Sequence, residues 1–157
     1  MPAKKLFDTA DIDMTKVVAT REDIYEVNPH RYEFMLLDGV IHHDVEAGEI
    51  VGFRETREDE FWVKGHIPGR PLFPGVLMIE AGAQLVSYYV MKMEPDKGFL
   101  GFGGVSDVKF RGAVVPGDRL VFLGKLLEHR SRRSVGLVQG FVGDRMVFEG
   151  KITGMWV

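Results

Sequence analysis

One stretch of the chain, residues 75–93, carries apolar side chains on every side of a helical projection. A helix at the protein surface would instead show a polar face every three or four residues. Pro74 stands just before this stretch and Pro95 shortly after it, where prolines commonly flank helices. The pattern therefore predicts a long helix over 75–93 that is buried in the core of the protein.

The remainder of the chain is typical of β structure interrupted by turn signals such as Ala47-Gly48, Pro116-Gly117 and Gly143-Asp144. A short helix is expected to begin at Thr20, whose hydroxyl can cap a free N–H, and to end at Asn28-Pro29. We expect strands over 34–44, 49–56, 99–111, 118–130, 133–143 and 145–156. This order favours an α+β fold, with a curved antiparallel sheet wrapped around one long buried helix.

Composition narrows the class of protein. A length of 157 residues suits one domain, and we expect an N-terminal arm over 1–19 followed by a single domain over 20–157. The net charge of −3 and the lack of a dense basic stripe argue against nucleic acid as a partner. The absence of cysteine excludes disulfides and thiolate chemistry. Since no secretory signal or membrane-length apolar run is visible, a cytoplasmic location is expected.

An acidic residue inside the apolar helix is the first sign of chemistry. Burying an unpaired carboxylate is costly, so Glu80 calls for a functional or structural reason. Gln84 lies one turn later on the same face, where its amide can donate to the carboxylate. His66 lies on a Gly/Pro-rich loop before the helix, and imidazole is the natural base near neutral pH. Taken alone, each side chain could equally be structural.

The beginning of the helix supplies a third element. The backbone N–H groups of Gly75, Val76 and Leu77 are expected to lack partners within the helix. They form a donor-rich, positive end suited to a carbonyl oxygen that gains charge. A base, an acid and such donors together fit proton abstraction beside a carbonyl, with assisted loss of a leaving group.

Three motifs carry a resemblance to a known family. They are Pro29-His30-Arg31-Tyr32-Glu33-Phe34-Met35-Leu36-Leu37-Asp38, the segment from His66 to Gln84, and Phe110-Arg111-Gly112 through Pro116-Gly117-Asp118. With their spacing, they make the chain over about residues 20–157 similar to the β-hydroxyacyl-acyl-carrier-protein dehydratases of FabZ type, which have the hotdog fold. Ile67 departs from the pattern, because the family usually has an aromatic residue after this histidine.

The resemblance implies a site shared between two subunits of a homodimer, which often assembles further into a trimer of dimers. His66 of one subunit would remove the α-proton of a 3-hydroxyacyl thioester, and Glu80 of the other would help to expel the hydroxyl as water. Gly75 and Val76 would polarise the thioester carbonyl, and Gln84 would orient Glu80. The acyl carrier protein would present its phosphopantetheine-linked chain to an apolar tunnel. No cofactor or metal is expected.

Two other functions stay open at this stage. A hotdog-fold thioesterase would use an acid on the same helix to direct water at the thioester, and a non-catalytic acyl-binding homologue would retain the motif for packing. His42-His43 suggests a metal site, but neighbouring residues of a strand point to opposite faces and cannot readily share one ion. Acyl length, isomerase activity and the choice between carrier protein and coenzyme A are left open.

Overall fold

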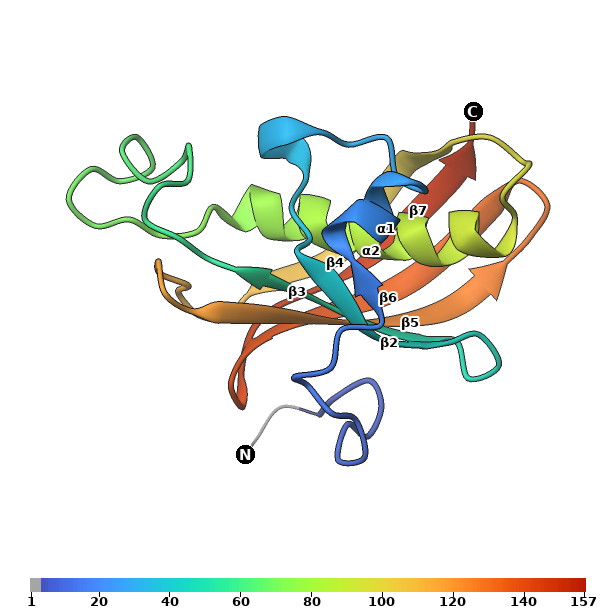
Figure 1. The fold of residues 1–157 in the computed structure, drawn as a ribbon, viewed down its shortest axis with the longest axis horizontal. Helices are drawn as coiled ribbons and strands as arrows, with labels where there is room; N and C mark the ends of the chain where they lie inside the picture. The colour runs from blue at the N-terminus through green and yellow to red at the C-terminus, as the bar shows by residue number, and fades with distance from the viewer. Residues whose placement is uncertain (1–3) are drawn as a thin grey trace.

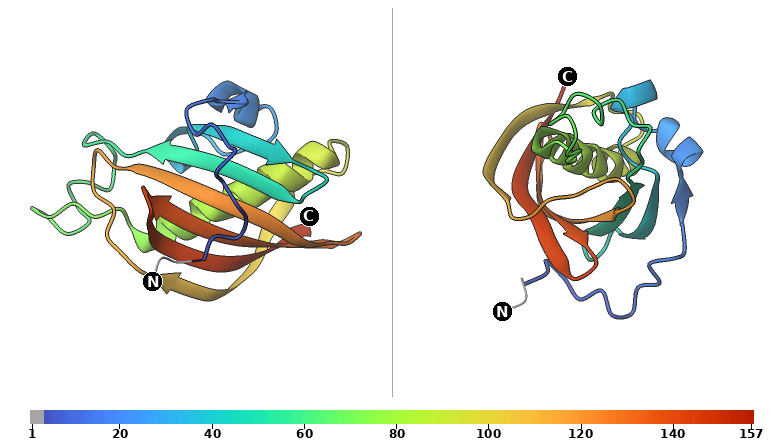
Figure 2. Two further views of the ribbon diagram at one scale, coloured as in Figure 1. Left: turned by 90° about the horizontal axis from the view of Figure 1, so that it is seen from below. Right: turned by 90° about the vertical axis from the view of Figure 1, so that its left-hand side faces the viewer.

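A seven-stranded antiparallel sheet curls around one long helix, as the computed structural model of residues 4–157 shows (Figure 1; Figure 2, right). The strand order is β1-β2-β3-β5-β6-β7-β4. The elements are β1 (Ala19–Thr20), α1 (Arg21–Tyr25), η1 (Tyr32–Phe34), β2 (Gly39–Asp44), β3 (Glu49–Glu55), α2 (Gly75–Met93), β4 (Leu100–Phe110), β5 (Arg119–His129), β6 (Arg133–Val142) and β7 (Arg145–Trp156). The predicted α+β class and the hotdog architecture are confirmed.

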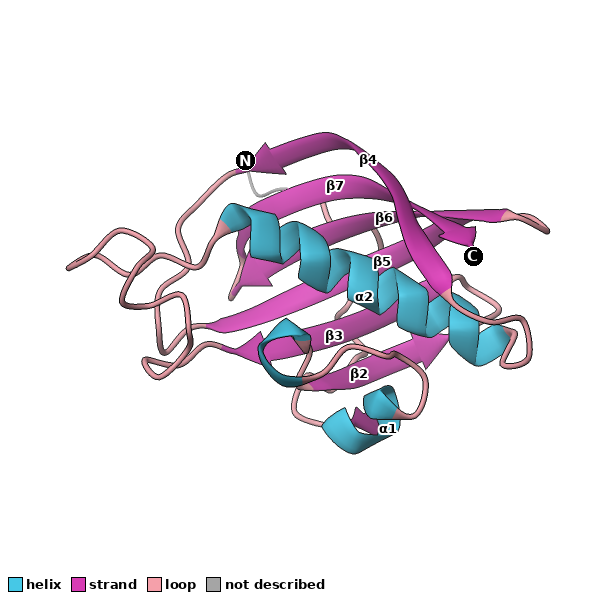
Figure 3. Ribbon diagram, turned by 90° about the horizontal axis from the view of Figure 1, so that it is seen from above, coloured by secondary structure: helices cyan, strands magenta, loops and turns pink. Residues whose placement is uncertain are grey.

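Helix α2 lies across the concave face of the sheet, and its bounds match the sequence prediction (Figure 3). Two glycines allow the close approach of helix and sheet, because a Cβ on Gly82 would meet Val138 at 3.1 Å and one on Gly136 would meet Val86 at 2.9 Å. Most of α2 from Met78 onward is buried, as predicted. Its first turn is not, since Val76 is 70% exposed. The helix therefore has a buried body and an accessible beginning.

The strand predicted over 34–44 is wrong in its first half. Strand β2 begins only at Gly39, and the preceding segment has irregular backbone after the single turn η1. Met35, Leu36 and Leu37 are nevertheless fully buried. Their apolar character explains the false strand prediction, because burial alone does not separate a strand from an irregular segment in the core. The backbone groups of this segment bind side chains of the site described below.

The short helix α1 begins as predicted, at a capping box in which Thr20 and Asp23 each bind the other's backbone N–H. It ends earlier than predicted, at Tyr25, and turns continue to Asn28. The side-chain amide of Asn28 is buried and donates to the carbonyl of Gln84 in α2 at 3.0 Å. The segment after α1 is thereby fixed to the long helix.

Residues 4–18 run across the outer face of the sheet (Figure 2, left). Gln139 of β6 fastens them, since its side chain accepts the N–H of Leu6 and donates to the carbonyl of Lys4. The apolar side chains of Leu6, Phe7, Ile12 and Met14 pack on a second cluster made by Ile41, Val51, Phe53, Leu123 and Phe141. The sheet thus has apolar contacts on both faces. Within residues 4–157, no helix has the length and hydropathy that a membrane crossing requires.

Candidate active site

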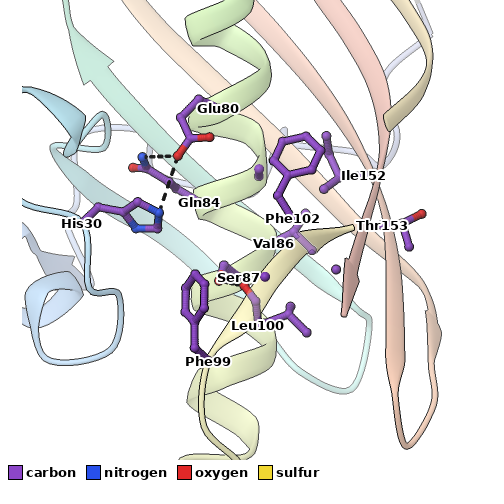
Figure 4. A pocket seen from close by; sticks show the side chains of 13 residues that line it. His30, Glu80, Gln84, Val86, Ser87, Phe99, Leu100, Phe102, Ile152 and Thr153 are labelled. Carbon is purple, nitrogen blue, oxygen red and sulfur yellow. Dashed lines mark hydrogen bonds and ion pairs between the residues drawn. The ribbon is translucent and has the colours of Figure 1, made fainter. Parts of the chain in front are cut away.

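Glu80 lies in the second turn of α2, where Gln84 holds its carboxylate (Figure 4). The Gln84 amide nitrogen donates to Glu80 Oε1 at 3.0 Å and to the carbonyl of Phe34 at 2.6 Å. The Gln84 amide oxygen accepts the N–H of Leu36 at 3.0 Å. Gln84 is 1% exposed. Both ends of its amide are therefore used, and the carboxylate of Glu80 has a fixed neighbour on the side facing residues 34–36.

His30 is a second neighbour of Glu80. Its Nε2 lies 3.5 Å from Glu80 Oε1, and its other ring nitrogen, Nδ1, is buried without a hydrogen-bond partner among the described residues. Burial lowers the pKa of His30 because it disfavours the charged imidazole, and the Glu80 carboxylate opposes this effect only in part. Glu80 Oε1 thus has two polar neighbours, the amide of Gln84 and the imidazole of His30.

His66 lies on the long loop between β3 and α2, which projects from one end of the molecule (Figure 1). Its Nδ1 lies 2.6 Å from the carbonyl of Leu72, on the returning arm of the loop. Because a carbonyl can only accept, Nδ1 carries the proton in this contact and Nε2 is left as the basic atom. The next residue, Ile67, has φ +60°, a left-handed conformation that β-branched residues rarely adopt.

The beginning of α2 offers two free donors rather than the predicted three. Among the described residues, the N–H groups of Gly75 and Val76 have no hydrogen-bond acceptor, but that of Leu77 donates to the carbonyl of Pro74 at 3.0 Å. Gly75 also lies against the ring of Phe110, which a Cβ at this position would meet at 2.8 Å. The packing of Phe110 therefore favours glycine at this position.

A small apolar cavity of about 50 Å³ adjoins Glu80, between α2 and the edge strand β4 (Figure 4). Its walls include Val86, Phe99, Leu100, Phe102 and Ile152. Within residues 4–157 of one chain, His66 and Glu80 are not within 4.0 Å of each other. The structure therefore places Glu80 beside an apolar cavity and His66 on a projecting loop, and a single chain does not bring the two side chains together.

The two adjacent histidines face opposite sides of β2, as predicted. The ring of His43 packs against Tyr89 of α2 at 4.9 Å between centroids, whereas His42 lies near Phe7 on the outer face. On that outer face, His42, Asp44 and Glu49 have possible ligand atoms within 4.8 Å of one another. The Lys125 ammonium lies 3.7 Å from Glu49 and already supplies a positive charge there. This cluster lies far from α2's first turns in the fold and has no part in the candidate site.

Sequence reasoning missed the part that His30 and Phe110 play in this site. From the sequence alone, the expected role of His30 is a structural hydrogen bond near the junction of the short helix and the next strand, or a contact with a carrier. Its position in the first family motif was a usable signal, but nothing in the spacing placed it beside Glu80. Phe110 ends β4 and lies over Gly75, with its ring 5.9 Å from that of Phe148.

Solved structures share this fold. The dehydratase heterocomplex ApeI:P of Xenorhabdus doucetiae contains a chain that aligns with a TM-score of 0.72 at 17% identity, covering 85% of this chain and 90% of that one. A sigma28-regulated virulence protein of Campylobacter jejuni aligns with a TM-score of 0.66 at 19% identity, covering 89% and 94%. At such low identity, the likeness establishes the fold alone.

Sequence comparison goes further. Residues 28–151 match the model of the FabA-like domain. The 3-hydroxyacyl-[acyl-carrier-protein] dehydratase FabZ of Moorella thermoacetica is 38% identical over 131 residues, which cover 82% of this chain and 90% of that protein. FabZ of Chlamydia trachomatis serovar L2 is 33% identical over 141 residues, covering 88% and 92%. The chain therefore belongs to the FabA-like family and, at this level of identity and coverage, to its FabZ 3-hydroxyacyl-[acyl-carrier-protein] dehydratases.

Proposed function

We propose that His66 and Glu80, contributed by two copies of the chain, dehydrate a 3-hydroxyacyl thioester to the trans-2-enoyl thioester. The reaction is that of the FabZ relatives, which are named as 3-hydroxyacyl-[acyl-carrier-protein] dehydratases, and we place it in fatty acid biosynthesis. The substrate is accordingly an acyl chain carried on acyl carrier protein. The assignment of roles to individual residues rests on their geometry, as follows.

His66 has the arrangement of a general base. With the Nδ1 proton directed at the Leu72 carbonyl, Nε2 keeps a lone pair that can accept a proton. In the proposed reaction, Nε2 takes the proton from the carbon next to the thioester carbonyl. The electron pair of that C–H bond forms the new double bond, and the C–O bond to the hydroxyl breaks. Imidazole suits this step because its ordinary pKa lies close to neutrality.

Glu80 has the arrangement of a general acid. Gln84 donates a hydrogen bond to Oε1, and His30 Nε2 lies 3.5 Å from the same oxygen, so Oε2 is the oxygen left to act on the substrate. In its protonated form, Glu80 gives its proton to the departing hydroxyl, which leaves as water. The cycle is completed when the proton on His66 returns to Glu80 through solvent. Gly75 and Val76, with free N–H groups at the beginning of α2, would stabilise the charge on the thioester oxygen.

Dimerisation through β4 is the proposed way to bring the two groups together. Strand β4 ends the sheet, so one side of its 11 residues carries backbone groups that no neighbouring strand of the described chain uses (Figure 3). Its exposed apolar side chains include Phe102, Val105 and Phe110. A long, exposed, apolar edge strand of this kind readily pairs with a strand of another chain. A second copy pairing there would continue the sheet and cover the cavity beside Glu80.

The clamp of Gln84 on Glu80 is the observation that most strongly supports an acid role. A buried amide here fixes the orientation of a carboxyl group that lies next to an apolar cavity. Packing of the core alone does not need a carboxyl group in a fixed orientation. The direct test incubates the purified protein with 3-hydroxyacyl carriers of graded length and follows intact mass. Loss of one water is expected. Release of free carrier thiol without loss of water would support the thioesterase alternative, and binding without turnover the non-catalytic one.

A further inference from the structure

A buried ion pair joins the sheet to the base of the loop that carries His66. Arg54 of β3 and Glu60 form it, with side chains only 7% and 3% exposed. Burying two charges costs desolvation energy, and replacing such a pair by apolar residues is often neutral for stability. Stability alone is therefore a weak reason for an ion pair at this position. The backbone groups that Arg54 and Glu60 bind indicate another role.

Glu60 fixes the outgoing arm of the loop. Its Oε2 accepts the N–H of Arg57 at 2.8 Å, and its backbone carbonyl accepts the N–H of Val63 at 3.1 Å. The next turn follows at once, since the N–H of His66 donates to the carbonyl of Trp62 at 2.8 Å. Two consecutive turns thus lead from the buried carboxylate of Glu60 to the proposed base. A shift in the position of Glu60 would therefore also shift His66.

Arg54 holds the other half of the site. Its Nη1 donates to the carbonyl of Met35 at 3.0 Å, while Nη2 binds Glu60. The residues on either side of Met35 are those that hold Gln84, because the carbonyl of Phe34 and the N–H of Leu36 both bind its side chain. Gln84 in turn holds Glu80. The guanidinium of Arg54 therefore contacts both Glu60, which fixes the His66 loop, and Met35, which lies in the segment that holds Gln84 and through it Glu80.

We propose that Arg54 and Glu60 are positioning residues, which set the His66 loop at a fixed place relative to the segment that orients Glu80. This inference rests on the proposed function. In the proposed symmetric dimer, the interface sets the place of each chain relative to the two-fold axis. With that placement given, the relation between the His66 loop and the Glu80 segment within each chain determines the distance between base and acid across the interface. Neither side chain reaches the substrate, and both act through the backbone that they bind.

The test separates positioning from stability with an apolar pair. In the variant Arg54→Met/Glu60→Leu, the charges are removed together, and the melting temperature is expected to stay close to that of the wild type. The value of kcat should fall between about tenfold and a hundredfold, because small misplacements of reacting groups have effects of that size. KM should change by less than about threefold, since substrate binding is not removed. Arg54→Lys, which can pair with Glu60 but not also reach Met35, should give an intermediate kcat.

Glu55→Gln is the matched control. Glu55 is the next residue of β3, and its ion pair with Arg119, at 3.1 Å, is on the surface. Its loss should leave kcat unchanged. If the double variant does not fold, Glu60→Gln decides, because it keeps the shape of the side chain and removes only the charge; its kcat should fall by about tenfold.

A second readout does not depend on turnover. Amide hydrogen exchange over residues 61–72 should become faster in the folded Arg54 and Glu60 variants and remain unchanged in Glu55→Gln. A folded double variant with kcat within about twofold of the wild type and unchanged exchange in the loop would overturn the proposal. If the wild-type protein itself removed no water, the proposed function would fail, and the exchange experiment would still decide whether the pair positions the loop.

Discussion

Glu80 and His66 are held in opposite ways. Glu80 lies on a helix whose body is packed on all sides, and a buried glutamine with both amide ends bonded sets its orientation. His66 lies on an exposed loop, where its ring makes one hydrogen bond, to a carbonyl of the same loop. The core of the protein therefore fixes Glu80, the proposed acid. The position of His66, the proposed base, depends on a few specific contacts where its loop leaves the sheet.

Substitutions near Glu80 and in the His66 loop should therefore affect activity and stability in different ways. A change near Glu80 has to disturb the core before it can move the carboxyl group, so loss of activity and loss of stability should occur together. A change in the His66 loop can alter the position of the imidazole while the core stays intact. Loops of this kind are commonly the least stable part of a fold. Activity and stability should therefore separate there, and the following changes test whether they do.

Removal of the base should have the largest effect on activity. His66→Ala is expected to lower kcat/KM by at least about a hundredfold, the usual contribution of a general base. Because the side chain is only half-buried and makes one hydrogen bond, the melting temperature should hardly change. Steady-state kinetics and thermal unfolding of the same preparation provide the check. A variant that keeps more than about a tenth of wild-type activity would remove His66 from the role of base.

Removal of the Gln84 amide, which holds Glu80, should lower both activity and stability. Gln84→Leu leaves the N–H of Leu36 buried without an acceptor and frees Glu80. We expect a loss of about 2 kcal/mol in the free energy of unfolding, seen in urea titrations, together with a clear fall in kcat. Ser87→Ala, one turn further along α2, is the control. Its hydroxyl makes only weak contacts, to the sulfur of Met91 at 3.2 Å and to the carbonyl of Leu100 at 3.4 Å, and its loss should have little effect. An unaltered kcat in Gln84→Leu would argue against an orienting role.

Relief of backbone strain in the His66 loop should raise stability while it lowers activity. Ile67, at φ +60°, should be relieved by Ile67→Gly, with a gain of less than about 1 kcal/mol because glycine also frees the unfolded chain. The greater freedom of the loop should lower kcat. Gly69, at φ +82°, is the mirror case, and Gly69→Ala should cost about 1 kcal/mol. Equal stability of the two variants in chemical unfolding would contradict this account of the loop.

Acid should weaken the region around Glu80 slightly. Because burial lowers the pKa of His30, the folded chain binds a proton there more weakly than the unfolded chain does. Stability should therefore fall as the pH drops through the ordinary histidine pKa, near 6.5, towards the lower folded value. The pKa of His43 is lowered by burial as well and acts in the same direction. His30→Gln should show a shallower dependence of melting temperature on pH, and an identical slope would refute the assignment.

The sequence allowed the helix and most of the sheet to be predicted, for physical reasons. The apolar run bounded by prolines determines α2, and the turn residues determine β5, β6 and β7 to within one or two positions. The segment 35–38 was mistaken for a strand because its burial follows from contacts with Gln84 and Arg54, which no local pattern reveals. In the candidate site, too, contacts that form only in the folded chain were missed. Its acid, base and helix donors lie in one motif, but His30 and the Arg54–Glu60 pair come close to them only through the fold.

Complementation between two inactive variants tests the shared site most directly. His66→Ala and Glu80→Ala are each expected to be inactive, and the two are then unfolded, mixed in equal amounts and refolded. If each site takes its base from one chain and its acid from the other, the mixed dimers contain one intact site, and about a quarter of wild-type activity should return. If both groups act within one chain, no combination restores a site. A mixture that forms dimers but stays inactive would contradict the account.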